Sequence, residues 1–458
     1  MKGQEKFDRF IQKHPHSHRF FFERPHVTRR DFFRWAGAGL TGSVLAGPLR
    51  AGEASKPLAT PINKAKNTIF LLLSGAISHI DTFDFKRTQD TPLDVMKPET
   101  FSGIEFPAGI MPRLAENVPD MAIIRSARSW ALQHNLAQTW TQIGRSPASA
   151  LGEVAPNTGS VVALEYLSRR KPTDTFPTFL ALNSGNAIGS GYLPSTHEPF
   201  RINPEANGLP DTNNADGQTR FNDKYAWLKQ IDAHRTSSPN SPDLVDYDKF
   251  YNNARGLMFN PVVDQAFRFT TQESQRYGAT GFGNACLTAG KVLAADQGTR
   301  YIQITLGGWD HHQNIYTALP PLARTLDNGL SALIADLKSS GQFNQTMIVM
   351  MGEFGRTVGR ITGQQGRDHF LQQFILFAGA GIRGGRALGA TDETGARSAT
   401  MAWSRDRDVR PEDVEATIYS AMGIDWTTIR YDDPFGRGFE YVPYAREDVY
   451  GPIHELWS

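Results

Sequence analysis

Cysteine is almost absent from this 458-residue chain, which contains only Cys286. A single cysteine excludes an intrachain disulfide, and its context NACLTAG lacks the second cysteine of a redox or zinc motif. A formal net charge of +1 gives no reason to expect a nucleic-acid partner. No stretch has the roughly 20 apolar residues needed to cross a bilayer, so the sequence predicts no stable membrane span. With 42 glycines and 27 prolines, the composition is that of a loop-rich globular protein.

Positive charge is concentrated at the amino terminus, where residues 1–35 contain nine Lys/Arg against four Asp/Glu. Residues 28–34 read TRRDFFR and are followed by the weakly apolar stretch AGAGLTGSVLAG and the small residues RAGEAS. This order is typical of a twin-arginine signal. We therefore predict a leader over residues 1–54, the twin-arginine export machinery as a partner, and a location in the periplasm or at the cell surface. The alternative is that the paired arginines begin an ordinary helix.

Near-continuous apolar runs that end at or near glycine recur along the rest of the chain. They cover residues 67–75, 175–182, 300–308, 346–355 and 373–382. Such runs are typical of strands buried on both faces of a parallel sheet. Residues 319–341 carry leucines at helical spacing, which predicts a strand–helix–strand unit over 300–352. We predict an α/β fold with a mostly parallel, doubly wound sheet in a domain at 67–458, and a loop-rich insert at about 184–245.

Histidines and carboxylates follow several of these predicted strands. Ligands bind beyond the carboxyl ends of parallel strands, and mixed imidazole and carboxylate groups suit Zn or Mn. The sequence therefore predicts a site for one or two divalent metal ions. The candidate ligands are Asp81, Asp84, Asp310, His312, Glu353, Asp368 and His369.

Each of these residues also has a structural interpretation. Asp310 could cap the helix that follows it. Glu353 and Arg356 could form an ion pair at a strand end, and Asp81 and Asp84 could belong to turns.

The stretch GGWDHHQN, at 307–314, contains two adjacent histidines. Side chains two apart in an extended segment share a face, and the one between them points the opposite way. We therefore expect Asp310 and His312 to face the site, His311 to point away, and Trp309 to shield the loop from solvent.

The motifs SGAISHIDTFD, RYIQITLGGWDHHQN, TMIVMMGEFGRT, GRDHF and AGAGIRGGRALGATDETG occur in this order. Together they resemble the domain of unknown function 1501 family of the alkaline phosphatase and sulfatase superfamily. The resemblance runs from about residue 67 to the carboxyl terminus. It implies an alkaline-phosphatase-like fold and a metal site.

The resemblance also implies roles for single positions. Asp81 or Asp84 takes the place of the first-strand carboxylate of a two-metal site. Asp310 and His312 match an Asp-x-x-x-His pair at shorter spacing, and His369 takes the place of the last metal histidine. A further histidine of the superfamily falls on Phe354, so a single-metal or remodelled site is an alternative.

The catalytic positions inferred from this resemblance are His134, Arg356 and Arg367. His134 stands where sulfatases carry their nucleophile, and a histidine there could act as a nucleophile, bind a metal or cap a helix. Cys286 is far from any such motif, which argues against formylglycine chemistry. Arg356 or Arg367 would hold the oxygens of an ester. The predicted function is an exported, metal-dependent hydrolase of phosphate or sulfate esters on small molecules or glycans. The alternative is a non-catalytic surface or glycan-binding protein of the same fold.

Overall fold

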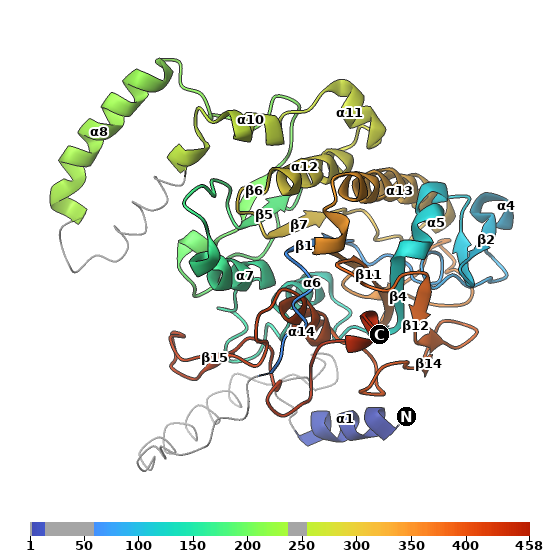
Figure 1. Ribbon diagram of the computed structural model, residues 1–458. Coiled ribbons are helices and arrows are strands. Elements are labelled where there is room, and N and C mark those ends of the chain that lie inside the picture. The colour runs from blue at the N-terminus through green and yellow to red at the C-terminus, as the bar shows by residue number, and fades with distance from the viewer. Residues whose placement is uncertain (1, 14–58, 237–253) are drawn as a thin grey trace, which may run out of the picture.

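The computed structural model describes residues 2–13, 59–236 and 254–458 (Figure 1). The predicted twin-arginine segment at 28–34 lies outside the described residues, so export stays a prediction. Among the helices within those three ranges, none is long and apolar enough to cross a lipid bilayer.

An eight-stranded sheet forms the centre of the protein, with the strand order β12-β4-β11-β8-β1-β7-β5-β6. All neighbours are parallel except those of β11, which runs antiparallel to β8 and β4. The prediction of a mostly parallel α/β sheet is confirmed, and all five predicted runs contain strands. The strands are β1 (Asn67–Leu72), β4 (Met121–Arg128), β5 (Phe179–Leu182), β6 (Phe200–Ile202), β7 (Tyr301–Thr305), β8 (Thr346–Met351), β11 (Gln372–Gly379) and β12 (Arg386–Leu388).

Helices cover both faces of this sheet, as predicted for a doubly wound fold (Figure 1). Side chains of β1 alternate between two buried clusters: Ile69 and Leu71 join one, and Phe70 and Leu72 join the other. Because each strand is buried on both sides, its sequence is apolar at successive positions. One face carries α5 (Pro112–Asn117), α12 (Gly281–Ala295) and α13 (Ile315–Ser339), and the other carries α6 (His134–Ile143), α7 (Thr158–Tyr166) and α14 (Pro411–Ala421).

Short helices and two-stranded sheets surround this centre. The helices are α1 (Lys2–Lys13), α4 (Leu93–Met96), α10 (Pro261–Phe267) and α11 (Thr271–Arg276). The paired strands are β2 (Pro98–Phe101) with β3 (Ile104–Pro107), β9 (Gly355–Arg356) with β10 (His369–Phe370), β13 (Ala390–Thr391) with β14 (Ser398–Thr400), and β15 (Ile429–Arg430) with β16 (Phe439–Glu440).

The predicted loop-rich insert is described as far as residue 236. It contributes β6, the edge strand beside β5, and the helix α8 (Gly217–Thr236), which extends away from the body in Figure 1. After Gly217 this helical stretch contains neither glycine nor proline, which explains why it is regular where the preceding residues form loops.

Helix α14 is buried along its whole length although it carries several carboxylates. The Oε1 atom of Glu415 accepts hydrogen bonds from the hydroxyls of Thr158 (3.1 Å) and Tyr419 (2.8 Å). Its Oε2 atom is buried without a hydrogen-bond partner. Burial raises the pKa of Glu415 to about 8, against the opposing effect of the Arg145 charge.

This carboxyl group should make the protein less stable as the pH rises. In the unfolded chain Glu415 ionises with the ordinary glutamate pKa of 4.5, whereas the folded protein keeps the proton until about pH 8. Between these values the unfolded state is increasingly favoured, by up to about 5 kcal/mol in total. Glu415→Gln should remove this loss, so its melting temperature relative to wild type should rise steadily from pH 5 to pH 8. A constant difference across that range would show that Glu415 has an ordinary pKa.

Candidate metal centre

The carboxyl ends of β1, β7 and β8 lead into the loops that carry most of the predicted site residues. These three strands are neighbours, with β1 between the other two. Residues that follow them therefore emerge at one edge of the sheet, where ligands bind in folds of this kind. The amino terminus of α6 and the short strand β10 add further polar side chains to this edge.

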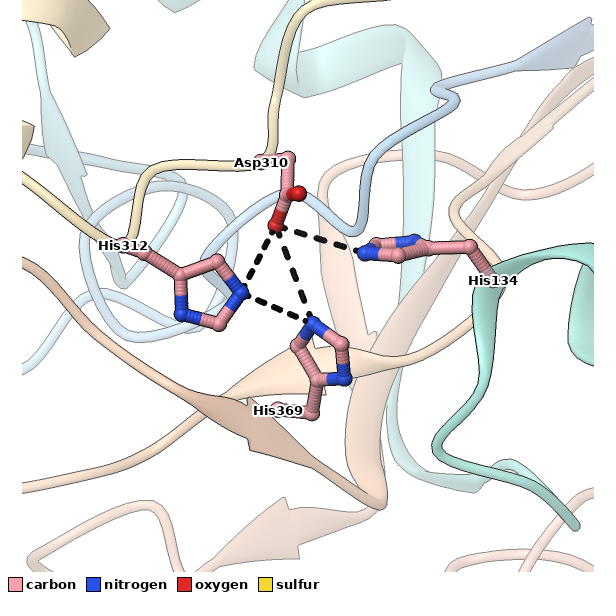
Figure 2. A group of neighbouring side chains, drawn as sticks. All are labelled: His134, Asp310, His312 and His369. Carbon is pink, nitrogen blue, oxygen red and sulfur yellow. Dashed lines mark hydrogen bonds and ion pairs between the residues drawn. The ribbon is translucent and has the colours of Figure 1, made fainter.

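Four side chains meet there and could hold a metal ion: His134, Asp310, His312 and His369 (Figure 2). One ligand atom from each lies within 4.8 Å of all the others. The Asp310 Oδ1 atom is 3.1 Å from His312 Nε2, 3.3 Å from His134 Nε2 and 3.7 Å from His369 Nε2. Four ligands with bonds of 2.0–2.1 Å to a tetrahedral Zn²⁺ lie about 3.4 Å apart, which is close to these separations.

The other ring nitrogen of each histidine has its own acceptor. His369 Nδ1 lies 2.6 Å from the carbonyl oxygen of Leu132, His134 Nδ1 lies 2.7 Å from Glu353 Oε1, and His312 Nδ1 lies 2.8 Å from Asp368 Oδ1. A carbonyl or an ionised carboxylate can only accept, so each Nδ1 carries the proton. The three Nε2 atoms are left as lone-pair donors directed at one point, which is the usual arrangement of metal-binding histidines.

The donor atoms of this cluster fit a bound cation, and the Arg356 guanidinium contacts two of them, Asp310 Oδ1 and His312 Nε2. The Nε2 atoms of His312 and His369 are only 3.0 Å apart, so two lone pairs face each other unless a proton or a metal ion lies between them. The buried Nε2 atom of His134 has no hydrogen-bond partner. Three imidazoles and one carboxylate form a donor set suited to Zn²⁺ or Mn²⁺.

Glu353 supports the centre by hydrogen bonding to His134, but it does not belong to the four-residue group. Its side chain is fully buried, and Oε1 accepts hydrogen bonds from His134 Nδ1, the Gly75 backbone (2.9 Å) and the Gln138 amide (3.0 Å). The hydrogen bond between His134 and Glu353 is the main reason that the pKa of His134 is raised. Gln138, one turn into α6, is a residue that sequence reasoning missed, because a lone glutamine in a helix carries no distinctive pattern.

Arg356 keeps the centre's own carboxylate ionised. Partial burial alone would raise the pKa of Asp310, but the paired Arg356 guanidinium and the nearby histidines hold that pKa below its usual value. Burial lowers the pKa of His369. Both groups are therefore in the protonation state that a metal ligand requires at neutral pH.

Arg356 and Arg367, which were predicted to hold substrate oxygens, instead make hydrogen bonds and ion pairs within the protein. Both are fully buried. Arg356 donates to Asp310 and to the carbonyl oxygens of Gly75, Ala76 and Arg367, and its Nη1 atom lies 3.3 Å from His312 Nε2. The N–H groups of its guanidinium donate to the loops that position Asp310, so they are not available to bind an oxyanion in a bidentate manner.

Arg367 forms a buried ion pair with Asp81, at 2.7 Å between Nε and Oδ2. The remaining lone pairs of Asp81 accept from Ser78 and from the hydroxyl of Tyr316 (3.0 Å). This carboxylate, predicted as a ligand, is thus occupied by an arginine and is not part of the four-residue cluster. The sequence could not reveal the pairing because the two residues are 286 positions apart.

Asp84 also lies outside the cluster. Its carboxylate is paired with Lys86 (3.2 Å) and Arg125 (3.3 Å) and accepts a hydrogen bond from Thr391 (2.5 Å). Neither Asp81 nor Asp84 is in the group that could hold a metal. Among the described residues, no second group of this kind is found. The structure thus brings together a single centre where the resemblance implied a two-metal site.

The GGWDHHQN loop sends its side chains in different directions. Asp310 and His312 are in the cluster and His311 is not. His311 is buried, which lowers its pKa to about 4. Trp309 is fully buried and donates from its indole to the Leu306 carbonyl (2.9 Å), consistent with a shielding role.

Phe354 occupies the position where the resemblance implied a histidine, and its apolar ring packs against the centre. Its ring centroid is 5.0 Å from that of His134 and 4.7 Å from that of His369. The ring holds these imidazoles by packing and offers no metal ligand. The histidine that the resemblance implied as a ligand of a second metal ion is therefore missing.

The fold and the centre together define an α/β protein with a histidine–carboxylate site beyond the ends of its parallel strands. The chain belongs to the DUF1501 family, whose model is described as a protein of unknown function and matches residues 65–447. The sequence has no significant match among curated proteins.

Several solved structures have a similar arrangement of the chain. Ps i-CgsB has a TM-score of 0.43 at 10% identity, over 84% of this chain and 77% of that one. The PsFucS1 sulfatase from Pseudoalteromonas sp. has a TM-score of 0.38 at 15% identity, over 79% and 68%. A protein of the alkaline phosphatase superfamily from Vibrio parahaemolyticus has a TM-score of 0.38 at 9% identity, over 82% and 72%. Likeness at this level concerns the fold and carries no conclusion about activity.

Proposed function

We propose that this protein is a hydrolase of phosphate or sulfate esters that depends on one divalent metal ion. The observation that carries the proposal is the convergence of the Nε2 atoms of His134, His312 and His369 on Asp310, with each Nδ1 atom within hydrogen-bond distance of an acceptor. His134, Asp310, His312 and His369 would hold the ion. When bound, a divalent ion acts as a Lewis acid toward ester oxygens and lowers the pKa of water.

The chain's own residues prepare the site for that chemistry. Glu353 and Asp368 hold the protons on the Nδ1 atoms of His134 and His312, and Arg356 holds Asp310 in its ionised form. Phe354 excludes water from one side of the imidazoles. With Arg356 and Arg367 both engaged, the ion itself would have to balance the charge of a bound ester.

A second candidate is a binding protein for surface glycans that has no catalytic activity. The observation in its favour is the lack of a free nucleophile in the described cluster, which contains only imidazoles and a carboxylate. Cys286, the single thiol, is fully buried, and burial raises its pKa, so it is not a reactive group.

Metal content and ester hydrolysis separate the two candidates. The purified protein should contain about one Zn²⁺ or Mn²⁺ per chain by elemental analysis. It should hydrolyse members of a panel of aryl phosphate and aryl sulfate esters, lose that activity to a chelator, and regain it with the metal. Bound metal without hydrolysis of any ester would favour the glycan-binding candidate. Absence of metal from wild type would remove the basis of the proposal.

We also propose export through the twin-arginine pathway, supported by the sequence TRRDFFR at 28–34. Replacing Arg29 and Arg30 together with lysine should leave the protein in the cytoplasm with its leader uncut. Fractionation of cells and the mass of the recovered protein measure both effects. Normal export of the double variant would contradict the assignment of the signal.

A further inference from the structure

A polar cavity of about 240 Å³ lies at the carboxyl end of α6. Its walls come from the residues that follow α6, from the first turn of α14, and from the β15–β16 hairpin with the residues after it. We call this cavity the α6–β16 pocket. The metal ligand His134 begins α6 and Ile143 ends it, so a helix about 15 Å long separates the pocket from that ligand. All residues that line the pocket lie beyond residue 54, so removal of the proposed leader leaves them in the exported protein.

Two carboxyl groups, those of Glu412 and Glu440, line this pocket. Glu412 is 1% exposed, and its two oxygens accept hydrogen bonds from the indole nitrogens of Trp130 and Trp140, both at 2.9 Å. Burial raises the pKa of Glu412 to about 7 and also raises the pKa of Glu440. Each carboxyl oxygen has a second lone pair, and a protonated carboxyl can also donate. Near neutral pH, Glu412 can therefore either accept from or donate to a hydroxyl group.

Arg145 brings a buried guanidinium to the same pocket. The guanidinium lies 3.9 Å from the ring centroid of Phe439, and its Nη2 atom donates to the carbonyl oxygen of Tyr441 (3.1 Å). Its Nε atom is buried and has no hydrogen-bond partner within the part of the chain that the structure describes. The hydroxyl of Ser149 adds a further polar group to the wall. A concave site with a few polar groups held in fixed positions is typical of small-molecule binding.

An exposed aromatic ring stands at the lip of the α6–β16 pocket. Tyr431, on the hairpin between β15 and β16, is 71% exposed. Gly438 lines the pocket and has a φ of +89°, and a Cβ atom there would lie 3.0 Å from the Tyr431 ring. The ring therefore packs against the backbone at the edge of the pocket and leaves most of its surface to solvent.

We propose that the α6–β16 pocket binds one ring of an uncharged glycan and that Tyr431 stacks on the neighbouring ring. The carboxyl groups oppose an anion and the guanidinium opposes a cation, so neither kind of ligand suits the pocket. Sugar hydroxyls both donate and accept, so they can satisfy carboxyl and guanidinium groups together. The pocket is smaller than the roughly 300–1,000 Å³ of sites for drug-sized ligands, which fits a single sugar ring. Because the pocket is separate from the metal centre, this inference rests on neither proposed function.

Native electrophoresis through gels that contain a soluble polysaccharide tests the pocket. The full-length chain should be retarded by at least one of starch, galactomannan, xyloglucan and arabinoxylan, and equally so after removal of metal. Ala150→Trp places an indole at the exposed rim and should weaken binding more than about 10-fold, because the sugar ring loses its hydrogen bonds. Tyr431→Ala should weaken binding roughly 3- to 10-fold, as expected for the loss of one stacking contact.

Ala215→Trp and Trp227→Ala are the matched controls, because they make the same kinds of change at exposed residues outside the pocket. Both should bind like wild type, with equal melting curves for all four variants. Retardation by none of the four polysaccharides, or undiminished binding by Ala150→Trp, would overturn the pocket as a sugar site. Stronger retardation by alginate, whose sugars are carboxylated, would overturn the assignment of an uncharged ligand. Equal affinity for the glycan and for its free monosaccharide would contradict the stacking role of Tyr431.

Discussion

His369→Ala should lower the affinity of the protein for Zn²⁺ by more than about 100-fold. Loss of a residue that supports a metal ligand typically costs 10–100-fold, and loss of the ligand itself should cost more. His369 contributes an Nε2 atom 3.0 Å from that of His312, and its ring is only half-buried at the start of the two-residue strand β10. Its removal therefore takes a donor from the centre together with ring contacts to His134, His312 and Phe354. Competition with a chromophoric chelator measures the affinity.

His311→Ala is the matched control for this experiment. The same imidazole is removed from the same region, but His311 lies outside the four-residue cluster, so affinity for the metal should change little. The metal-stripped His369→Ala protein should also melt close to stripped wild type. Much earlier melting would identify His369 as a structural residue, and equal losses of affinity at His311 and His369 would contradict the geometry of the centre.

Asp81→Asn should destabilise the protein by about 3–5 kcal/mol, the usual cost of removing one partner from a buried ion pair. Asp81 and Arg367 are both fully buried, and the substitution leaves the guanidinium charge uncompensated. The free energy of unfolding in urea, measured on metal-stripped protein, should report this loss directly. Refolded Asp81→Asn should still bind Zn²⁺ like wild type, because Asp81 is not among the four converging groups.

Asp368→Asn provides the comparison, since it makes the same chemical change on a side chain that is 62% exposed. Its stripped form should unfold like stripped wild type. If Asp81→Asn instead lost its metal while keeping its stability, Asp81 would be a ligand, as the sequence first suggested, and its pairing with Arg367 would not persist in solution.

The sequence predicted the sheet well because burial on both faces leaves a local signature. Residues 67–72, 301–305 and 346–351 are mostly apolar, and they form β1, β7 and β8. Strand β4 is missing from the predictions since its run MAIIRSAR ends in charged and small residues and lacks the closing glycine. The helix over 319–341 was predicted from leucine spacing, and the structure extends it back to Ile315 through two prolines.

By itself, the sequence determined which segments are buried and which chemical groups follow them. The side chains of Asp310 and His312 lie in the cluster and that of His311 does not. The segment is not extended as predicted, because the backbone nitrogens of His311 and His312 donate to the carbonyl oxygens of Trp309 (2.9 Å) and Asp310 (3.1 Å). Only the tertiary structure decided that His134, from another helix, and His369, from a two-residue strand, reach the same point as that loop. It also decided that Asp81 faces an arginine. Contacts between residues more than 200 positions apart depend on how whole elements pack against the sheet, and no local pattern of polar residues records that packing.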